Sequence, residues 1–142
     1  MPLVVRTPWT QANGTVNTAP VLNIDLASTI SQLAGVTPGG RQDGASFVPF
    51  LHGRRVRWRH SFVIEYLGAN KLRSGGPPPY IAIRTKRYLY VEYRRGWREL
   101  YDLRTDPYEL QNRAGDPTYG GIELRLHRAL HKLYTAPPHV TA

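Results

Sequence analysis

The sequence predicts an α+β fold in which a small antiparallel four-stranded sheet is covered by a C-terminal helix. Between residues 80 and 103, three short segments alternate apolar and polar side chains and are separated by tight turns, as in an antiparallel meander. Residues 62–66 form a fourth segment of the same kind. Farther along, residues 122–134 carry apolar side chains at helical spacing, so they are the natural cover for one face of the sheet.

A strand–loop–helix segment is expected before the sheet. Leu3-Val4-Val5 is a short β-branched run that predicts a strand, and residues 7–20 are rich in Thr, Asn, Gly and Pro, as in an exposed connection. A helix should then start at Asn23 or Asp25, either of which can cap it, and stop at Gly35 in a left-handed conformation. Its apolar stripe consists of Leu26, Ile30, Leu33 and Ala34. The short apolar run 47–51 should add one helical turn.

The bounds of the later elements follow from the alternation. The strands are expected at Phe62–Tyr66, Tyr80–Arg84, Tyr88–Tyr93 and Trp97–Leu103. The turns at 85–87 and 94–96 are short enough to fix the register of the last three strands. The covering helix is expected at Ile122–Tyr134, where the apolar side chains are Ile122, Leu126, Ala129, Leu130 and Leu133.

Composition limits the classes of function. The chain has 142 residues, a formal net charge of +9 and no cysteine, so it has no disulfide, thiolate metal site or cysteine nucleophile. No apolar run approaches the roughly 18–20 residues of a membrane span, and the first residues lack the pattern of a signal peptide. The positive charge favours polyanionic partners such as nucleic acid, an anionic membrane or a sulfated substrate. A basic surface without a specific ligand explains it equally well.

The basic run at residues 54–59 is the best candidate for a functional surface. Its arginines suit planar oxyanions, because a guanidinium group can bind two oxygens at once. The candidate substrate-binding residues are Arg54, Arg55, Arg57 and Arg59. The alternative is a solvated linker between two domains.

No metal site or catalytic group is predicted. His127 and His131 are spaced i, i+4 on the last helix and can in principle share a metal, but no carboxylate stands between them in the manner of zinc proteases. We therefore interpret them as exposed helix residues. In the segment 99–112, Asp106 and Asn112 are expected to begin and end a turn, which is a structural role.

Tyrosines and arginines alternate between residues 88 and 101, and this pattern allows one competing function. Bases stack on aromatic rings and arginines hold phosphates in sheet-type RNA-binding domains. The basic and aromatic octapeptide of such domains is missing, however, and tyrosine is also favoured in any half-exposed strand. Binding of RNA is therefore the less favoured interpretation.

The order of the segments resembles the C-terminal region of a sulfatase of the alkaline-phosphatase-like superfamily. Seven segments carry the resemblance over residues 2 to about 134. They are the expected strand Leu3 to Pro8; Asp25-Leu26-Ala27-Ser28-Thr29, with Ser28 where the family has proline; Leu33-Ala34-Gly35; Asp43 to Gly53; the strand that ends in Glu65; Arg84-Thr85-Lys86-Arg87-Tyr88; and Glu99 to Asn112. Each is weak alone, and the ordered set is specific. Within the family, the strand sequences are most similar to those of the glucosamine-6-sulfatase-like branch.

The resemblance implies a larger parent enzyme. Its α/β domain would carry a formylglycine, made from Cys or Ser in a Cys/Ser-x-Pro-x-Arg motif, and a calcium ion held by Asp and Asn. Neither motif occurs in this sequence, so the resemblance places no catalytic residue and no metal ligand on this chain. Both are expected upstream of Met1. Glu65 joins the four arginines as a candidate substrate-binding residue.

The resemblance also implies a division of the chain. Residues 1–53 would be the tail end of the large α/β domain, and residues 54–142 the C-terminal subdomain. We expect the chain to be inactive alone, to support the folding and substrate cleft of the parent, and to have the upstream catalytic domain as its partner. An N-terminal segment without its usual sheet is expected to expose an apolar face and to form oligomer contacts. The alternative is a stand-alone basic module that binds polyanions such as sulfated glycans or RNA.

Overall fold

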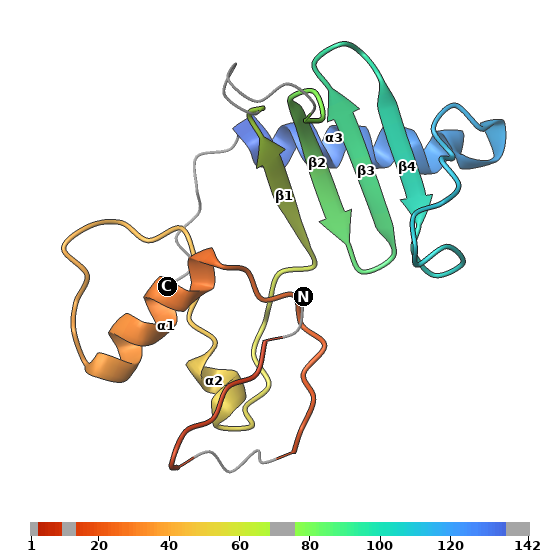
Figure 1. The fold of residues 1–142 in the computed structure, drawn as a ribbon. Coiled ribbons are helices and arrows are strands. Elements are labelled where there is room, and N and C mark those ends of the chain that lie inside the picture. Colours follow the sequence, from red (N-terminus) through yellow and green to blue (C-terminus); the bar gives the residue numbers. More distant parts are fainter. Residues whose placement is uncertain (1–2, 10–13, 69–75, 136–142) are drawn as a thin grey trace. The chain divides into compact units, whose positions relative to one another are not determined.

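The computed structural model describes residues 3–9, 14–68 and 76–135. They form two compact units, one within Met1–Arg59 and the other within His60–Pro137. The first unit contains two helices, and the second contains the sheet and the long helix (Figure 1). No helix among the described residues is long and apolar enough to cross a membrane.

The first unit is built around helix α1, Ile24–Ala34. The helix ends as predicted at Gly35, whose φ of 68° lies in the left-handed region. The N–H of Gly35 donates to the carbonyl of Gln32, and the N–H of Val36 donates to that of Ser31. These bonds satisfy two of the carbonyl groups that a helix end leaves free. The short helix α2, Val48–Leu51, confirms the helical turn expected there.

Polar bonds tie α1 to the chain segment that leads into α2. The Ser28 hydroxyl donates to the carbonyl of Gly44, and the Thr29 hydroxyl accepts the N–H of Phe47. The backbones approach closely here: a Cβ added to Gly44 would lie 2.1 Å from the carbonyl oxygen of Ile24. Glycine is therefore required at this position. Phe47, Val48 and Leu51 are buried beside this junction.

Two expectations for the first unit differ from the structure. Within the described part of the chain, residues 3–7 form no strand, although Leu3-Val4-Val5 predicts one. A strand is stable only when it pairs with others in a sheet. The side chains of Leu3, Val4 and Val5 are exposed, Val4 at 89%. The predicted apolar stripe of α1 is also open to solvent, with Ile30 63% exposed. The helix instead buries Asp25 and Thr29.

The second unit is the predicted four-stranded antiparallel sheet, with its strands in sequence order. The strands are β1 (Ser61–Tyr66), β2 (Tyr80–Thr85), β3 (Tyr88–Tyr93) and β4 (Arg98–Asp102). Each of the four strands expected in this sheet is present, and no strand end differs from its expected position by more than one residue. The register pairs Ile83 of β2 with Val63 on one side and Tyr90 on the other, and Tyr90 with Leu100 of β4.

Helix α3, Gly120–Thr135, covers one face of this sheet, as predicted (Figure 1). A short 3-10 helix, η1 (Pro117–Tyr119), leads into it. The core between helix and sheet consists of Ile83, Tyr88, Tyr90, Leu100, Leu126 and Leu130. Side chains two residues apart in a strand share a face, so Glu92 lies on the helix side together with Tyr88 and Tyr90.

Along the chain, the first unit passes into the second between Arg59 and His60. The boundary predicted from the resemblance, between residues 53 and 54, concerns a larger protein and stays a prediction.

Candidate functional site

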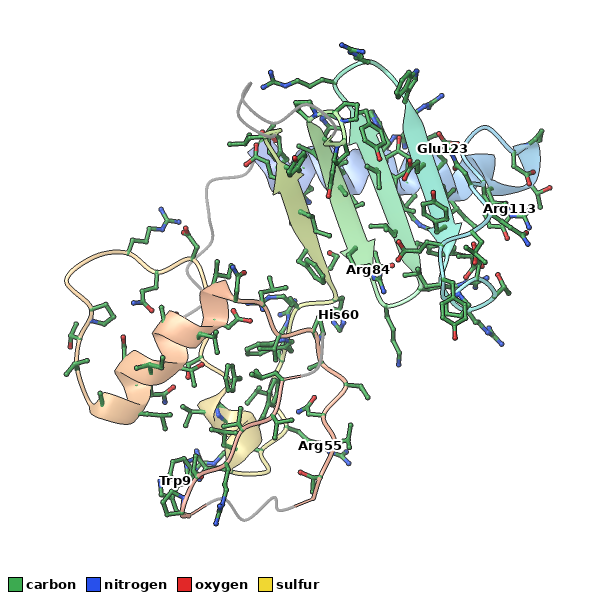
Figure 2. All side chains as sticks on the ribbon, in the orientation of Figure 1. Trp9, Arg55, His60, Arg84, Arg113 and Glu123 are labelled. Atoms are coloured by element: carbon green, nitrogen blue, oxygen red, sulfur yellow. The ribbon has the colours of Figure 1, made fainter. Side chains whose placement is uncertain are left out.

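The basic run of the first unit divides into exposed and internally paired arginines. Arg54, Arg55 and Arg57 are exposed, and Arg55 lies at the surface of its unit (Figure 2). Arg59 instead forms a bidentate ion pair with the carboxylate of Asp25, whose side chain is fully buried. The three exposed residues remain free to meet an anion, whereas Arg59 has a structural partner.

Asp25 is the hub of the first unit. Its carboxylate accepts the N–H of Leu22 at 2.7 Å and of Ala45 at 2.9 Å, besides the guanidinium of Arg59. Burial by itself raises the pKa of this carboxyl, but these hydrogen bonds outweigh burial and hold the pKa below its usual value. The charged form therefore joins three segments of the unit.

Glu65, the fifth predicted substrate-binding residue, lies in the second unit on β1. Its carboxylate accepts a hydrogen bond of 2.6 Å from the Tyr134 hydroxyl of α3. This bond also raises the pKa of Tyr134, so the phenol stays protonated and donates. The five candidate residues are thus divided between the two units.

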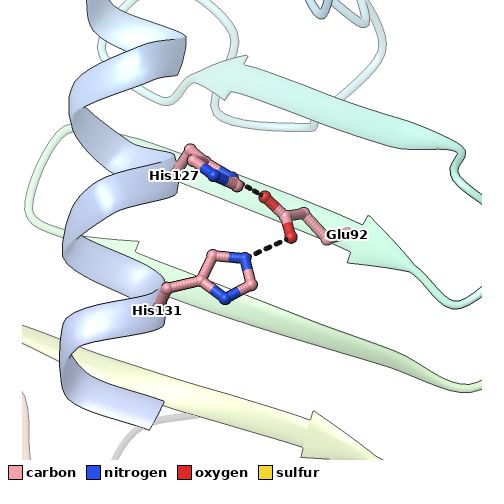
Figure 3. Close-up of side chains that lie close together, drawn as sticks. All are labelled: Glu92, His127 and His131. Carbon is pink, nitrogen blue, oxygen red and sulfur yellow. Dashed lines mark hydrogen bonds and ion pairs between the residues drawn. The ribbon is translucent and has the colours of Figure 1, made fainter. Parts of the chain in front are cut away.

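A carboxylate and two imidazoles meet between β3 and α3 (Figure 3). Glu92 Oε1 lies 2.5 Å from His127 Nδ1, and Glu92 Oε2 lies 2.8 Å from His131 Nε2. The histidines are one helical turn apart on α3, so both rings reach the same strand residue. One nitrogen or oxygen atom from each of the three residues lies within 4.8 Å of the others.

The surroundings of Glu92 favour its charged form. Burial tends to raise the pKa of this carboxyl, but hydrogen bonds from His127, Tyr90 and His131 lower it below the usual range. The Tyr90 hydroxyl donates to Glu92 Oε1 at 2.8 Å. Burial and the neighbouring Glu92 charge raise the pKa of Tyr90, which therefore stays protonated. The carboxylate is fixed by three donors from two elements.

A small pocket of about 350 Å³ lies next to this cluster. His127 and Tyr90 line it together with Arg98 and Glu123. Glu123 is nearly buried, yet it has an ion-pair partner in Arg98 at 3.0 Å and accepts the N–H of Gly115 at 2.9 Å. The pocket is therefore polar on its walls and close to neutral in charge.

The other face of the sheet carries mostly aromatic and apolar side chains, and no described helix or strand of its unit covers it. Tyr66, Tyr80 and Tyr93 form a row across β1, β2 and β3, with ring centroids 5.4 and 5.5 Å apart. All three are half-buried. We call this the open face; it comprises Phe62, Ile64, Tyr66, Tyr80, Ala82, Arg84, Leu89, Val91, Tyr93, Glu99 and Tyr101.

The segment Glu99–Asn112 has the structural role that its sequence predicts. Asp102 is nearly buried and bound by Arg87 through Nε at 3.0 Å and Nη2 at 2.7 Å, which lowers the pKa of the carboxyl. Asp106 accepts the N–H groups of Leu110 and Gln111. The side-chain Oδ1 of Asn112 accepts the N–H of Leu100 at 3.0 Å and so holds the turn against β4.

Comparison with known proteins gives one consistent result. Residues 1–136 match the family described as N-sulphoglucosamine sulphohydrolase, C-terminal. The chain is 36% identical over 115 residues to a Delta 4,5-hexuronate-2-O-sulfatase of Bacteroides thetaiotaomicron, covering 75% of this chain and 22% of that protein. It is 29% identical to an N-acetylglucosamine-6-sulfatase of Bos taurus, covering 80% of this chain and 26% of that protein.

Solved structures agree with the sequence matches. A 2-O GAG sulfatase superposes with a TM-score of 0.66 and 34% identity, over 78% of this chain and 23% of the other. The phosphonate monoester hydrolase of Agrobacterium radiobacter superposes with a TM-score of 0.67 and 30% identity, over 78% and 24%. The chain thus spans about a quarter of the length of the relatives that it matches.

Proposed function

The chain belongs to the N-sulphoglucosamine sulphohydrolase C-terminal family of sulfatases, and we propose that it is the supporting C-terminal portion of a sulfuric ester hydrolase. The observation that carries this proposal is the family match over residues 1–136, in a chain about a quarter as long as its sulfatase relatives. In this proposal the chain stabilises a separate catalytic portion, helps to shape its substrate cleft and has no turnover alone.

The sequence lacks the groups that the implied chemistry requires. It has no cysteine, and none of its serines stands in a Ser-x-Pro-x-Arg motif from which formylglycine is made. Calcium needs six to eight oxygen ligands. Among the described residues, the one cluster with metal-ligand spacing has two nitrogen donors and one carboxylate. These residues do not fit a calcium–formylglycine site, so we assign both groups to the catalytic portion and derive no catalytic step here.

The open face supports the role of a docking unit. An antiparallel sheet with one covered face normally presents polar side chains on the other. Here the open face bears two charged residues, Arg84 and Glu99, and its other positions are tyrosines, Phe62 and aliphatic side chains. Aromatic residues with a polar tip are enriched in protein interfaces. We infer that the catalytic portion covers this face.

Two measurements test the proposal. The gene should continue upstream into a reading frame with a Cys/Ser-x-Pro-x-Arg motif. The purified 142-residue chain should not hydrolyse 4-nitrophenyl sulfate above the rate of a heat-denatured sample. An isolated gene would contradict the supporting role, and turnover that survives repurification would contradict the absence of catalysis.

The exposed arginines favour a second function, the binding of polyanions. Arg54, Arg55 and Arg57 place three unpaired positive side chains within four residues of each other. Each exposed charge contact contributes about 0.5 kcal/mol, so replacing all three by glutamine should weaken heparin binding roughly tenfold at low salt. The matched control removes three exposed arginines of the second unit, Arg94, Arg95 and Arg104. Equal losses in both variants would indicate attraction by net charge and no defined surface.

A further inference from the structure

We propose that Glu92, His127 and His131 form a binding site for a divalent transition-metal ion of the zinc class, which ties α3 to β3. The site is independent of the chemistry proposed for the sulfatase relatives, because it lies between the helix and the sheet of the C-terminal unit. Its test therefore needs no enzymatic activity.

The ligand atoms come from two elements with fixed geometry. His127 and His131 follow each other by one turn on α3, a 16-residue helix, and their ring centroids are 4.5 Å apart. Glu92 lies on a central strand that is paired on both sides, with Ile81 and with Arg98. Both rings point to the same carboxylate (Figure 3). A metal site requires this convergence of donors on one point.

The present hydrogen bonds occupy the position that a cation would take. Each imidazole nitrogen lies 2.5 or 2.8 Å from one carboxylate oxygen. Around a zinc ion, with bonds of about 2.0–2.2 Å, neighbouring donor atoms are roughly 3.3 Å apart. The distance to the carboxylate must therefore grow by about 0.8 Å for His127 and about 0.5 Å for His131. Both rings are nearly half exposed, which leaves room for this shift. The metal displaces the protons now shared between the rings and the carboxylate.

The donor set selects the class of metal. Imidazole is a good ligand for zinc and its neighbours in the first transition row, whereas calcium and magnesium prefer oxygen. Two imidazoles and one carboxylate leave at least one coordination position open, and the pocket beside His127 gives water access to it. The ion pair of Arg98 with Glu123 neutralises the nearest guanidinium and so limits repulsion of a cation.

A further hydrogen bond orients the Glu92 carboxylate. The Tyr90 hydroxyl, on the same strand, donates to Glu92 Oε1, and the Tyr90 side chain is fully buried. Such an outer hydrogen bond orients a ligand and typically changes metal affinity by about 10–100-fold. Tyr90 is therefore a positioning residue of this site. The sheet, the helix and Tyr90 together position the three ligand groups before a metal binds.

The experiment is titration of the metal-free 142-residue chain with ZnCl2, followed by calorimetry and by the 15N shifts of the histidine rings. We expect one zinc ion per chain, with shifts confined to His127 and His131 and a thermal midpoint that rises with zinc and falls again with EDTA. Excess MgCl2 or CaCl2 should not compete.

Variants locate the site. His131→Asn and Glu92→Gln should each weaken zinc binding by at least about 10-fold, and Tyr90→Phe by about 10-fold. His60→Asn, at an exposed histidine outside the cluster, should bind zinc as the wild type does. Circular dichroism of the metal-free variants checks that the fold is kept. Absence of zinc binding in the wild type, or ring shifts spread over other histidines, would overturn the proposal without reference to any variant.

Discussion

The ion pair of Asp25 and Arg59 joins residues 34 positions apart in the sequence. Asp25 is fully buried, and the Arg59 side chain is 19% exposed. A buried ion pair adds little compared with an apolar pair of the same shape, but removal of one partner leaves an uncompensated charge. The pair therefore acts on stability mainly through the cost of breaking it.

Arg59→Ala should destabilise the first unit by about 3 kcal/mol, since it strands the Asp25 carboxylate in the interior. Arg57→Ala, in the same run but exposed, should change stability by less than about 0.5 kcal/mol. Hydrogen exchange of the α1 amide groups measures the difference within this unit. Equal protection of α1 in the two variants would show that breaking the Asp25–Arg59 ion pair does not destabilise the unit.

Asp25 also gives stability a pH dependence. Its pKa is lower in the folded chain than the value of about 3.9 in an unfolded one. A lowered pKa stabilises the fold fully above the unfolded value, and this stabilisation is lost as pH falls through the folded value. Amide protection of α1 should therefore decline below about pH 4 in the wild type. In Asp25→Asn this decline should be smaller, and an unchanged decline would assign it to other carboxyl groups.

The histidine cluster shows where sequence reasoning stops at the scale of residues. The spacing of His127 and His131 is visible in the sequence, and it suggested a shared ligand. The carboxylate lies outside the helix: Glu92 comes from β3, 35 residues before His127. Only the strand register and the docking of α3 bring it there. A clue existed in Tyr88, Tyr90 and Glu92, whose even spacing places Glu92 on the covered face.

The alternating and helical patterns in the sequence are sufficient to predict the sheet and the long helix of the second unit. The alternation from Tyr80 to Asp102 fixed three strands, and the helical stripe of residues 122–133 fixed α3. Leu3–Val5 has the same β-branched character, yet it forms no strand. Strand propensity describes how a residue fits a sheet, and it does not supply the neighbouring strand. At Gly44 the requirement is steric, because the backbone of Ile24 lies too close to allow a Cβ atom.

Gly44→Ala should disrupt the junction between α1 and the segment leading to α2. The new Cβ would lie 2.1 Å from a backbone oxygen of Ile24, so the two segments must separate at a cost of about 1–3 kcal/mol. Separation would also weaken the bonds of Ser28 and Ala45 across the junction. Gly40→Ala is the matched control, because nothing lies within 4 Å of its added Cβ. Thermal unfolding that is the same for both variants would contradict this account.

The whole chain exposes more apolar side chains than a monomeric soluble protein usually does. Leu3, Val4 and the stripe of α1 are exposed in the first unit. On the open face of the second unit most side chains are half-buried, and Ala82 and Val91 are buried. Monomeric soluble proteins rarely leave such surfaces uncovered. Contacts between copies through the N-terminal segment remain a prediction, which light scattering of the purified chain measures. The catalytic portion is the occupant that the family membership favours.

The tyrosine row allows a direct test of that docking. Tyr66→Lys with Tyr93→Lys places two charges on the open face while leaving the core under α3 intact. Central aromatic residues of an interface typically contribute about 2 kcal/mol each, so binding to the separately expressed catalytic portion should weaken at least about tenfold. Leu124→Lys with Arg128→Lys, at exposed positions of α3, is the control. If the control weakens binding and the tyrosine variant does not, the catalytic portion contacts the helix side, and the open face needs another partner.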